Sequence, residues 1–176
     1  TESSYYFKDV TSSMGIDTNL SNNSMAWGDF NDDNYLDVLI SGKLYKNITA
    51  DTFTDVTSSA GIGNLPSPAG NGFIDFDNDG KLDIVFILNQ DTIAVYKNNG
   101  DETFTGNIIS GLSTYRGFAG LRSFSFADIN NDKYPDLFLS RLWTEYPPGG
   151  PDIVPNYFFI NDRNLGLTDS TKMIYP

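Results

Sequence analysis

The chain contains the acidic nonapeptide Asp75-Phe-Asp-Asn-Asp-Gly-Lys-Leu-Asp83 in three versions, and their spacing sets its architecture. The first version is Asp29-Phe-Asn-Asp-Asp-Asn-Tyr-Leu-Asp37, 46 residues earlier, and the third is Asp128-Ile-Asn-Asn-Asp-Lys-Tyr-Pro-Asp136, 53 residues later. We call these segments loop 1 (29–37), loop 2 (75–83) and loop 3 (128–136), and number the residues of each from 1 to 9. All three have the form D-x-[DN]-x-D-x-x-x-D, so side-chain oxygens recur at positions 1, 3, 5 and 9.

Two further motifs repeat together with the loops. The segment Phe7-Lys-Asp-Val-Thr-Ser-Ser-Met-Gly-Ile16 returns as Phe53-Thr-Asp-Val-Thr-Ser-Ser-Ala-Gly-Ile62, with eight of ten residues identical. The segment Leu44-Tyr-Lys-Asn47 returns as Val95-Tyr-Lys-Asn98 and, more loosely, as Phe158-Phe-Ile-Asn161. In every copy, the aromatic second residue of this motif is followed eight positions later by an apolar residue. That constant spacing is the length of a β-hairpin.

Each repeat predicts four short strands. In the first repeat we expect them at Ser24–Phe30, Asp37–Ser41, Lys43–Asn47 and Thr52–Thr57. The near-continuous apolar run Leu36–Ile40 suits a strand that is buried on both faces, as in sheets stacked on one another. A period of about 50 residues with four strands per unit is typical of a β-propeller blade. We therefore predict an all-β chain, a β-propeller built from four-stranded antiparallel blades.

The repeats divide the chain into one partial propeller domain, residues 1–176. We expect blades at 24–62, 70–112 and 122–171, and within 1–16 one extra outer strand, near Tyr5–Thr11, that belongs to a preceding blade. The third repeat carries a Pro- and Gly-rich insertion at about Leu142–Pro155. Propellers close with about four to eight blades, so we expect missing blades or other chains to complete the ring.

The composition narrows the classes of partner and chemistry. The 176 residues include 11 Lys and Arg against 23 Asp and Glu, a net charge of −12, which argues against nucleic acid because phosphate binding needs a basic surface. The chain has no Cys and no His, which excludes thiol chemistry, Cys/His zinc sites and imidazole catalysis. The longest apolar run, Ile84–Leu88, falls far short of the about 18 residues of a membrane span, so we expect no membrane insertion.

The acidic loops predict cation sites. Oxygens at positions 1, 3, 5 and 9, with the backbone carbonyl of position 7, can converge on one hard cation, and calcium favours such a flexible all-oxygen shell. An Asx-rich turn is the alternative for a single loop, but three equivalent loops favour calcium, with two to three ions. An EF-hand is excluded because position 12 carries no Glu and strands follow. The candidate ligands are Asp29, Asn31, Asp33, Tyr35 and Asp37; Asp75, Asp77, Asp79, Lys81 and Asp83; and Asp128, Asn130, Asp132, Tyr134 and Asp136.

The three loops are expected to differ in affinity. Loop 2 has carboxylates at all four positions, and Gly80 at position 6 provides a left-handed backbone without strain. Loop 1 has Asn31 at position 3 and Asn34 at position 6. Loop 3 has an amide at position 3 and Lys133 at position 6, which is strained if its φ is positive. The expected order of calcium affinity is loop 2, loop 1, loop 3.

These motifs resemble the FG-GAP/VCBS repeats over nearly the whole chain. The resemblance rests on D-x-D-x-D-G-x-x-D between two strands and on the LYKN and FTDVT-S-S-x-G-I segments that follow. It implies the calcium-binding propeller of integrin α subunits and of many bacterial surface and secreted proteins. It also implies an extracellular, cell-surface or periplasmic location, and loop ligands at positions 1, 3, 5 and 9 and the carbonyl of position 7.

The segments outside the repeat are the candidates for ligand binding. Aromatic residues with arginines on loops suit a glycan or protein ligand, although a connector between blades is the alternative. The candidates are Tyr115, Arg116, Arg122, Arg141, Trp143 and Tyr146. We favour a calcium-stabilised extracellular binding or adhesion module. Part of a secreted polymer-degrading enzyme and an architectural subunit stay open, and the scarcity of ionisable groups outside the loops weighs against catalysis.

Overall fold

The computed structural model describes residues 7–20, 24–49, 51–63, 65, 68–88, 92–109, 121–141 and 156–171. It confirms an all-β architecture of three four-stranded antiparallel sheets, each with its strands in chain order. Blade 1 contains β1 (Met25–Gly28), β2 (Asp37–Ile40), β3 (Lys43–Thr49) and β4 (Thr52–Asp55). Blade 2 contains β5 (Gly70–Ile74), β6 (Asp83–Ile87), β7 (Ile93–Asn98) and β8 (Phe104–Ile109). Blade 3 contains β9 (Leu121–Ala127), β10 (Asp136–Arg141), β11 (Tyr157–Asn161) and β12 (Leu167–Asp169).

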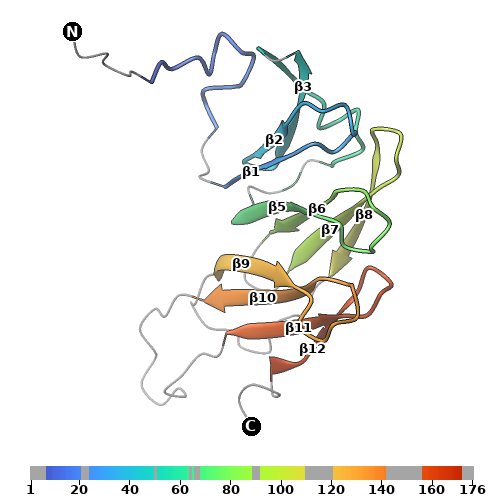
Figure 1. Cartoon of the computed structure of the whole chain (residues 1–176). Helices are drawn as coiled ribbons and strands as arrows, with labels where there is room; N and C mark the ends of the chain where they lie inside the picture. The colour runs from blue at the N-terminus through green and yellow to red at the C-terminus, as the bar shows by residue number, and fades with distance from the viewer. Residues whose placement is uncertain are drawn as a thin grey trace, which may run out of the picture.

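The blades stack face to face without closing into a ring (Figure 1). β6 is buried along its whole length because it lies in the middle blade, as its apolar sequence predicts. Side chains of blades 1 and 2 form one apolar cluster, which includes Leu39, Leu44, Phe86 and Tyr96. A second cluster joins the opposite face of blade 2 to blade 3. The core of this protein therefore lies between the sheets.

Glycine at the first strand of a blade lets the neighbouring blade approach. A Cβ added at Gly28 of β1 would lie 2.7 Å from the ring of Phe73 in β5. A Cβ added at Gly72 of β5 would lie 3.0 Å from the ring of Phe124 in β9. In both cases an aromatic ring of the next blade occupies the space of the missing side chain, so the spacing between blades depends on these glycines.

The N-terminal segment repeats a connection between blades but forms no strand within residues 7–20. The Met14 carbonyl accepts a hydrogen bond from the Phe53 N–H at 2.8 Å, as the Ala60 carbonyl does from Phe104. Phe7 is fully exposed, whereas its equivalents Phe53 and Phe104 are only 6% and 5% exposed. Residues 7–11 of the predicted outer strand are therefore not in a strand, and residues 5 and 6 lie outside the described part.

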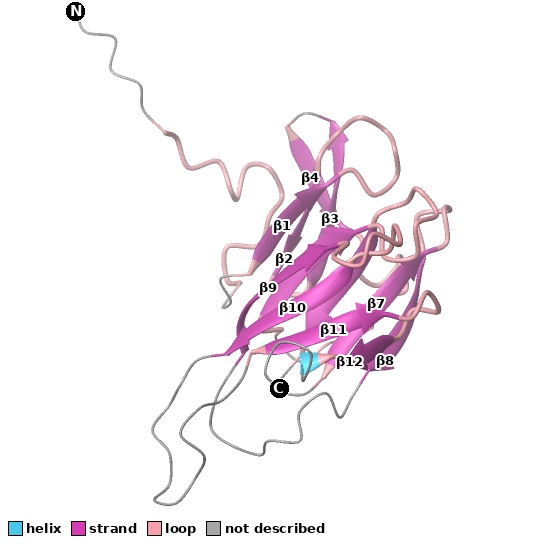
Figure 2. Ribbon diagram, turned by 60° about the horizontal axis from the view of Figure 1, so that its bottom comes forward, coloured by secondary structure: helices cyan, strands magenta, loops and turns pink. Residues whose placement is uncertain are grey.

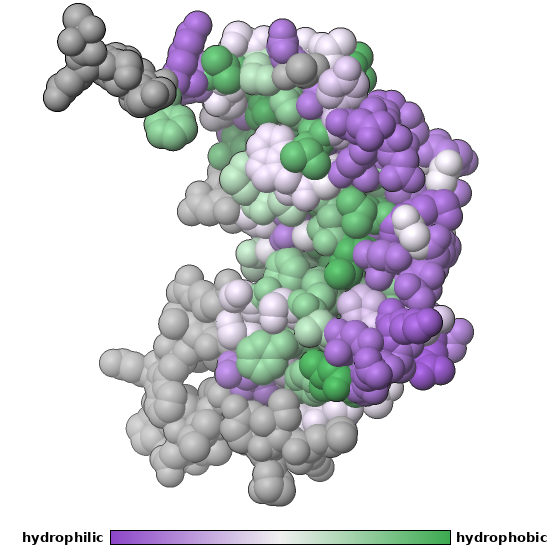
Figure 3. All heavy atoms as spheres, in the orientation of Figure 1, coloured by the Kyte–Doolittle hydropathy of each residue, from purple (hydrophilic) through white to green (hydrophobic). Residues whose placement is uncertain are grey.

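All three acidic loops lie at the same edge of the stack. Each loop joins the first strand of its blade to the second, and the described loops gather at one end of the strands (Figure 2). Hydrophilic side chains concentrate along this edge, while apolar side chains run through the middle of the stack (Figure 3). Among the described residues, no helix has the length and hydrophobicity needed to cross a membrane.

Candidate metal centres

The Asp at position 1 shapes each loop through the same pair of hydrogen bonds. Its Oδ1 accepts the backbone N–H of position 5, at 3.1 Å in loop 1, 3.0 Å in loop 2 and 2.9 Å in loop 3. Its Oδ2 accepts the N–H of position 6, at 2.8, 2.9 and 2.8 Å. The Oδ1 of position 5 then accepts the N–H of position 7. The repeated sequence therefore gives one loop geometry three times.

The tight loops require left-handed backbone at two positions. At position 6, φ is 70° at Asn34, 86° at Gly80 and 75° at Lys133, which confirms the predicted role of this position. Lys133 therefore has a backbone conformation that is unfavourable for residues other than Gly, Asn and Asp. Position 4 is also left-handed, with φ near 60° in every loop, a feature that the sequence pattern did not indicate.

The Asp at position 9 is buried and connects the loop to the sheet. Asp37, Asp83 and Asp136 are 0%, 0% and 1% exposed. Their Oδ2 atoms accept the N–H of position 2 at 3.1, 2.9 and 3.1 Å. Their Oδ1 atoms accept the N–H of the Asn that ends the L-Y-K-N motif, at 2.8, 2.8 and 2.9 Å. Each oxygen keeps a second lone pair, so a cation can share it with the backbone.

The pKa of Asp83 is raised to about 6, chiefly by burial and to a smaller extent by the nearby charges of Asp77 and Asp79, while the two backbone hydrogen bonds lower it. Burial also raises the pKa of Asp37 to about 6, with Asp33 and Asp29 adding to the effect. A cation in the loop would act in the opposite direction, because an opposite charge at close range favours the ionised carboxylate. In loops 1 and 2, burial therefore disfavours the ionised form of the position-9 carboxylate.

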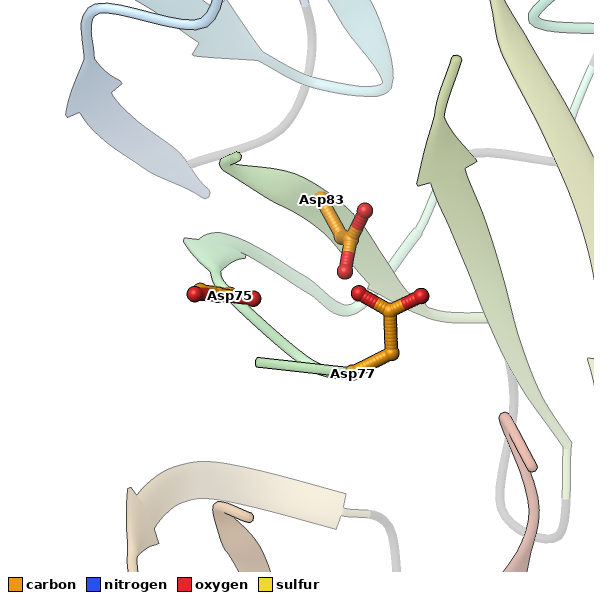
Figure 4. A group of neighbouring side chains, drawn as sticks. All are labelled: Asp75, Asp77 and Asp83. Atoms are coloured by element: carbon orange, nitrogen blue, oxygen red, sulfur yellow. The ribbon is translucent and has the colours of Figure 1, made fainter. Parts of the chain in front are cut away.

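Loop 2 brings three carboxylates close enough together to hold a metal ion. Ligand oxygens of Asp75, Asp77 and Asp83 all lie within 4.8 Å of one another, and the Asp77 and Asp83 carboxylates face each other (Figure 4). Two oxygens on opposite sides of calcium lie about 4.6–5.2 Å apart, since each bond is about 2.3–2.6 Å long. Asp77 Oδ1 is buried and has no hydrogen-bond partner within the described part of the chain. The chemistry and spacing of these oxygens fit calcium.

Loop 1 shows the same unsatisfied oxygen. Asn31, at position 3 like Asp77, has a buried Oδ1 atom that the described residues leave without a hydrogen-bond partner. Buried polar atoms are nearly always hydrogen-bonded or bound to an ion or water. An unpartnered oxygen at the same position of two loops therefore indicates that both loops bind the same kind of ligand. Among the described residues, only loop 2 brings three acidic side chains within mutual reach, in keeping with the amides at position 3 of loops 1 and 3.

Basic side chains lie against the acidic loops. Lys97 of β7 contacts the Asp77 carboxylate and places Nζ 3.0 Å from Asp79 Oδ2, and this pairing raises the pKa of Lys97. Arg163 lies 3.0 Å from Asp132 in loop 3. These cations offset part of the repulsion within the loops, so Lys97 and a metal ion would compete for the same carboxylates.

The described structure does not place the predicted ligand-binding side chains. Arg122 lies in β9 and Arg141 in β10, but their side chains are outside the described part, as are Tyr115, Arg116, Trp143 and Tyr146 entirely. Sequence reasoning also missed the roles of Asn98 and Asn161. Asn98 Nδ2 donates to the Phe30 carbonyl of blade 1 at 2.8 Å, and Asn161 Nδ2 donates to the Phe76 carbonyl of blade 2 at 2.8 Å. The invariant Asn of the L-Y-K-N motif was the available signal.

Four-stranded blades that stack face to face, each with an acidic loop between its first two strands, define a β-propeller-like repeat module. In a comparison with protein-family models, residues 75–139 match an FG-GAP-like repeat, a segment that runs from loop 2 through loop 3 into β10. This match supports the resemblance seen in the sequence, and residues 75–139 contain an FG-GAP-like repeat. A search of curated proteins found no match.

Proposed function

We propose that this chain is a calcium-stabilised segment of a β-propeller that acts outside the cytoplasm as a binding or adhesion module. The observation that carries the calcium part is the buried, unsatisfied position-3 oxygen of loops 1 and 2, which in loop 2 belongs to a cluster of three carboxylates. Calcium would neutralise the loop charges and join the first and second strands of each blade. Because binding to the folded state alone adds folding free energy, the role of the ion is structural.

Calcium removal tests this part of the proposal. Native mass spectrometry in calcium is expected to show two or three ions per chain, and chelation with EDTA should remove them and lower the midpoint of thermal unfolding. At a free calcium concentration about 100 times the Kd, each site adds about 2.7 kcal/mol to the free energy of unfolding. Two such sites would therefore raise the midpoint of thermal unfolding by many degrees. Magnesium at the same concentration is the control, because it demands a stricter geometry. A chain with no bound calcium and the same midpoint in EDTA would contradict the assignment.

The binding role rests on the family and on loop chemistry. Extracellular calcium is abundant enough to keep such loops filled, and aromatic and arginine side chains on loops suit a glycan or protein ligand. We expect the chain to retain ligands on a glycan array in calcium and to lose them in EDTA. Replacing Trp143 and Tyr146 by alanine should abolish that retention without changing the number of bound ions. If ligands were still retained in EDTA, ligand binding would not depend on calcium.

The face of blade 1 that is turned away from blade 2 supports a further blade as partner. Val38, Ile40 and Tyr45 are the equivalents of Ile84, Phe86 and Tyr96, which pack against blade 1 in the cluster between blades 1 and 2. In blade 1 itself this face contacts residues of the N-terminal segment, yet Met25 and Trp27 beside it remain 56% and 53% exposed. We propose that another blade of the same repeat covers this face. The native mass spectra described above would also show whether a second copy provides it.

A further inference from the structure

Glu102 belongs to blade 2 but places its carboxylate on loop 1 of blade 1. It lies in the turn between β7 and β8, and its Oε1 accepts a hydrogen bond from Asn31 Nδ2 at 3.3 Å. The same oxygen contacts Lys46 Nζ of β3. Asn31 is the position-3 residue of loop 1, where loop 2 has the carboxylate of Asp77. A residue of one blade therefore touches the candidate metal centre of its neighbour.

The contacts of Asn31 fix the orientation of its amide. Nδ2 donates to Asp33 Oδ2 at 2.9 Å as well as to Glu102. An amide has two N–H donors, so two carboxylates that hold both donors leave the oxygen on the opposite side. That oxygen, Asn31 Oδ1, is the buried atom without a hydrogen-bond partner in the described structure. Glu102 thus helps to hold the amide so that this buried oxygen is left for a cation to bind.

Loop 2 lacks this arrangement and does not need it. Leu165 of blade 3 is the equivalent of Glu102, and the two share a left-handed backbone, with φ of 59° and 65°. The turn geometry is therefore the same, and only the side chain differs. A carboxylate such as Asp77 presents an oxygen in either orientation, so no neighbour has to orient it. The blade after the amide of loop 1 therefore carries an acid at this turn position, and the blade after the carboxylate of loop 2 carries an apolar residue.

The lysines show a matching difference. Lys97 contacts two carboxylates of loop 2, whereas its equivalent Lys46 contacts Glu102. Glu102 therefore pairs with the lysine whose equivalent in blade 2 pairs with the loop carboxylates, and it also binds the Asn31 amide. We propose that Glu102 is a positioning residue for the calcium site of loop 1, so that blade 2 completes the site of blade 1. This inference rests on the proposed calcium function.

A calcium titration followed by NMR tests the inference loop by loop. The backbone amides of Asn34 and Gly80, both at position 6, report separately on loops 1 and 2 in one uniformly ¹⁵N-labelled chain. Glu102→Ala is expected to weaken binding at loop 1 by about tenfold or more, the effect typical of losing an outer partner of a metal ligand, and to leave loop 2 unchanged. Asp101→Ala is the matched control, because Asp101 lies in the same turn but its carboxylate accepts hydrogen bonds from Thr103 of that turn.

The Asn31→Asp background distinguishes two effects of Glu102, the orientation of the position-3 side chain and the negative charge that Glu102 adds near loop 1. A carboxylate at position 3 needs no orientation, so Glu102→Ala should cost about threefold or less in that background. An equal loss in both backgrounds, or an equal loss at Asn34 and Gly80, would overturn the positioning role. The Asn31 side-chain N–H₂ resonances of the calcium-free chain give a second readout and should shift in Glu102→Ala but not in Asp101→Ala. If the wild-type chain binds no calcium at all, the proposed function fails before the variants are compared.

Discussion

Asp83→Ala is expected to remove much or all of the stability of the fold, with or without calcium. The substitution leaves the buried N–H groups of Phe76 and Asn98 without their acceptor. Each buried unsatisfied donor costs about 1–3 kcal/mol, which gives about 2–6 kcal/mol for the pair against a typical total of about 5–15 kcal/mol. Chemical denaturation in EDTA, followed by far-ultraviolet circular dichroism, measures this loss.

Asp79→Asn is the control for the metal contribution. Its amide oxygen still accepts the Lys81 N–H, and the ion pairs that it loses are partly exposed and of small value. This variant should match the wild type in EDTA and lose part of the gain from calcium. If Asp83→Ala also matched the wild type in EDTA, position 9 would be a metal ligand alone and not a structural element of the sheet.

Asn98→Ala is expected to have the second largest effect, because it breaks a buried hydrogen bond between blades 1 and 2. Asn98 Nδ2 donates to the Phe30 carbonyl at 2.8 Å and to the Leu82 carbonyl at 3.0 Å, and its Oδ1 accepts the Gly100 N–H at 2.9 Å. Loss of three such bonds at a buried site is expected to cost about 3 kcal/mol or more, at about 1 kcal/mol each.

Asn47→Ala provides the matched control within blade 1. Asn47 Nδ2 donates to the Leu36 carbonyl at 3.1 Å, and among the described residues it reaches no neighbouring blade. Its Oδ1 has no described partner. The free energy of unfolding should therefore fall about 1–2 kcal/mol less in Asn47→Ala than in Asn98→Ala. Equal losses would show that the contact between blades contributes nothing beyond the local turn.

The sequence was sufficient to predict the strands and the loops because both depend on local patterns. The four strands predicted for the first repeat agree with β1–β4 to within two residues at each end. Loop geometry follows from Asp at position 1 and from the left-handed residue at position 6, which lie five residues apart in the chain. Repetition strengthened the prediction, since one acidic turn is common but three equivalent turns are not.

The contacts between blades could not be predicted from the same patterns. Asn161 bonds a carbonyl 85 residues earlier, and Glu102 bonds a side chain 71 residues earlier. Such partners depend on how far and at what angle one sheet is displaced from the next, which periodicity does not specify. Asp37 shows a different limit within one blade: the sequence predicts a metal ligand, and the structure adds that its buried carboxylate accepts two backbone N–H groups.

The bonds of the buried Asp and Asn residues join into one line that crosses the whole stack. Phe30 O accepts from Asn98, Asn98 N–H donates to Asp83, and Asp83 accepts from Phe76. Phe76 O then accepts from Asn161, whose N–H donates to Asp136. This line runs along the loop edge and is independent of the covalent path between blades. Under a force that pulls the blades apart, the sheets should therefore separate first at the opposite edge and remain bonded longest at the loop edge.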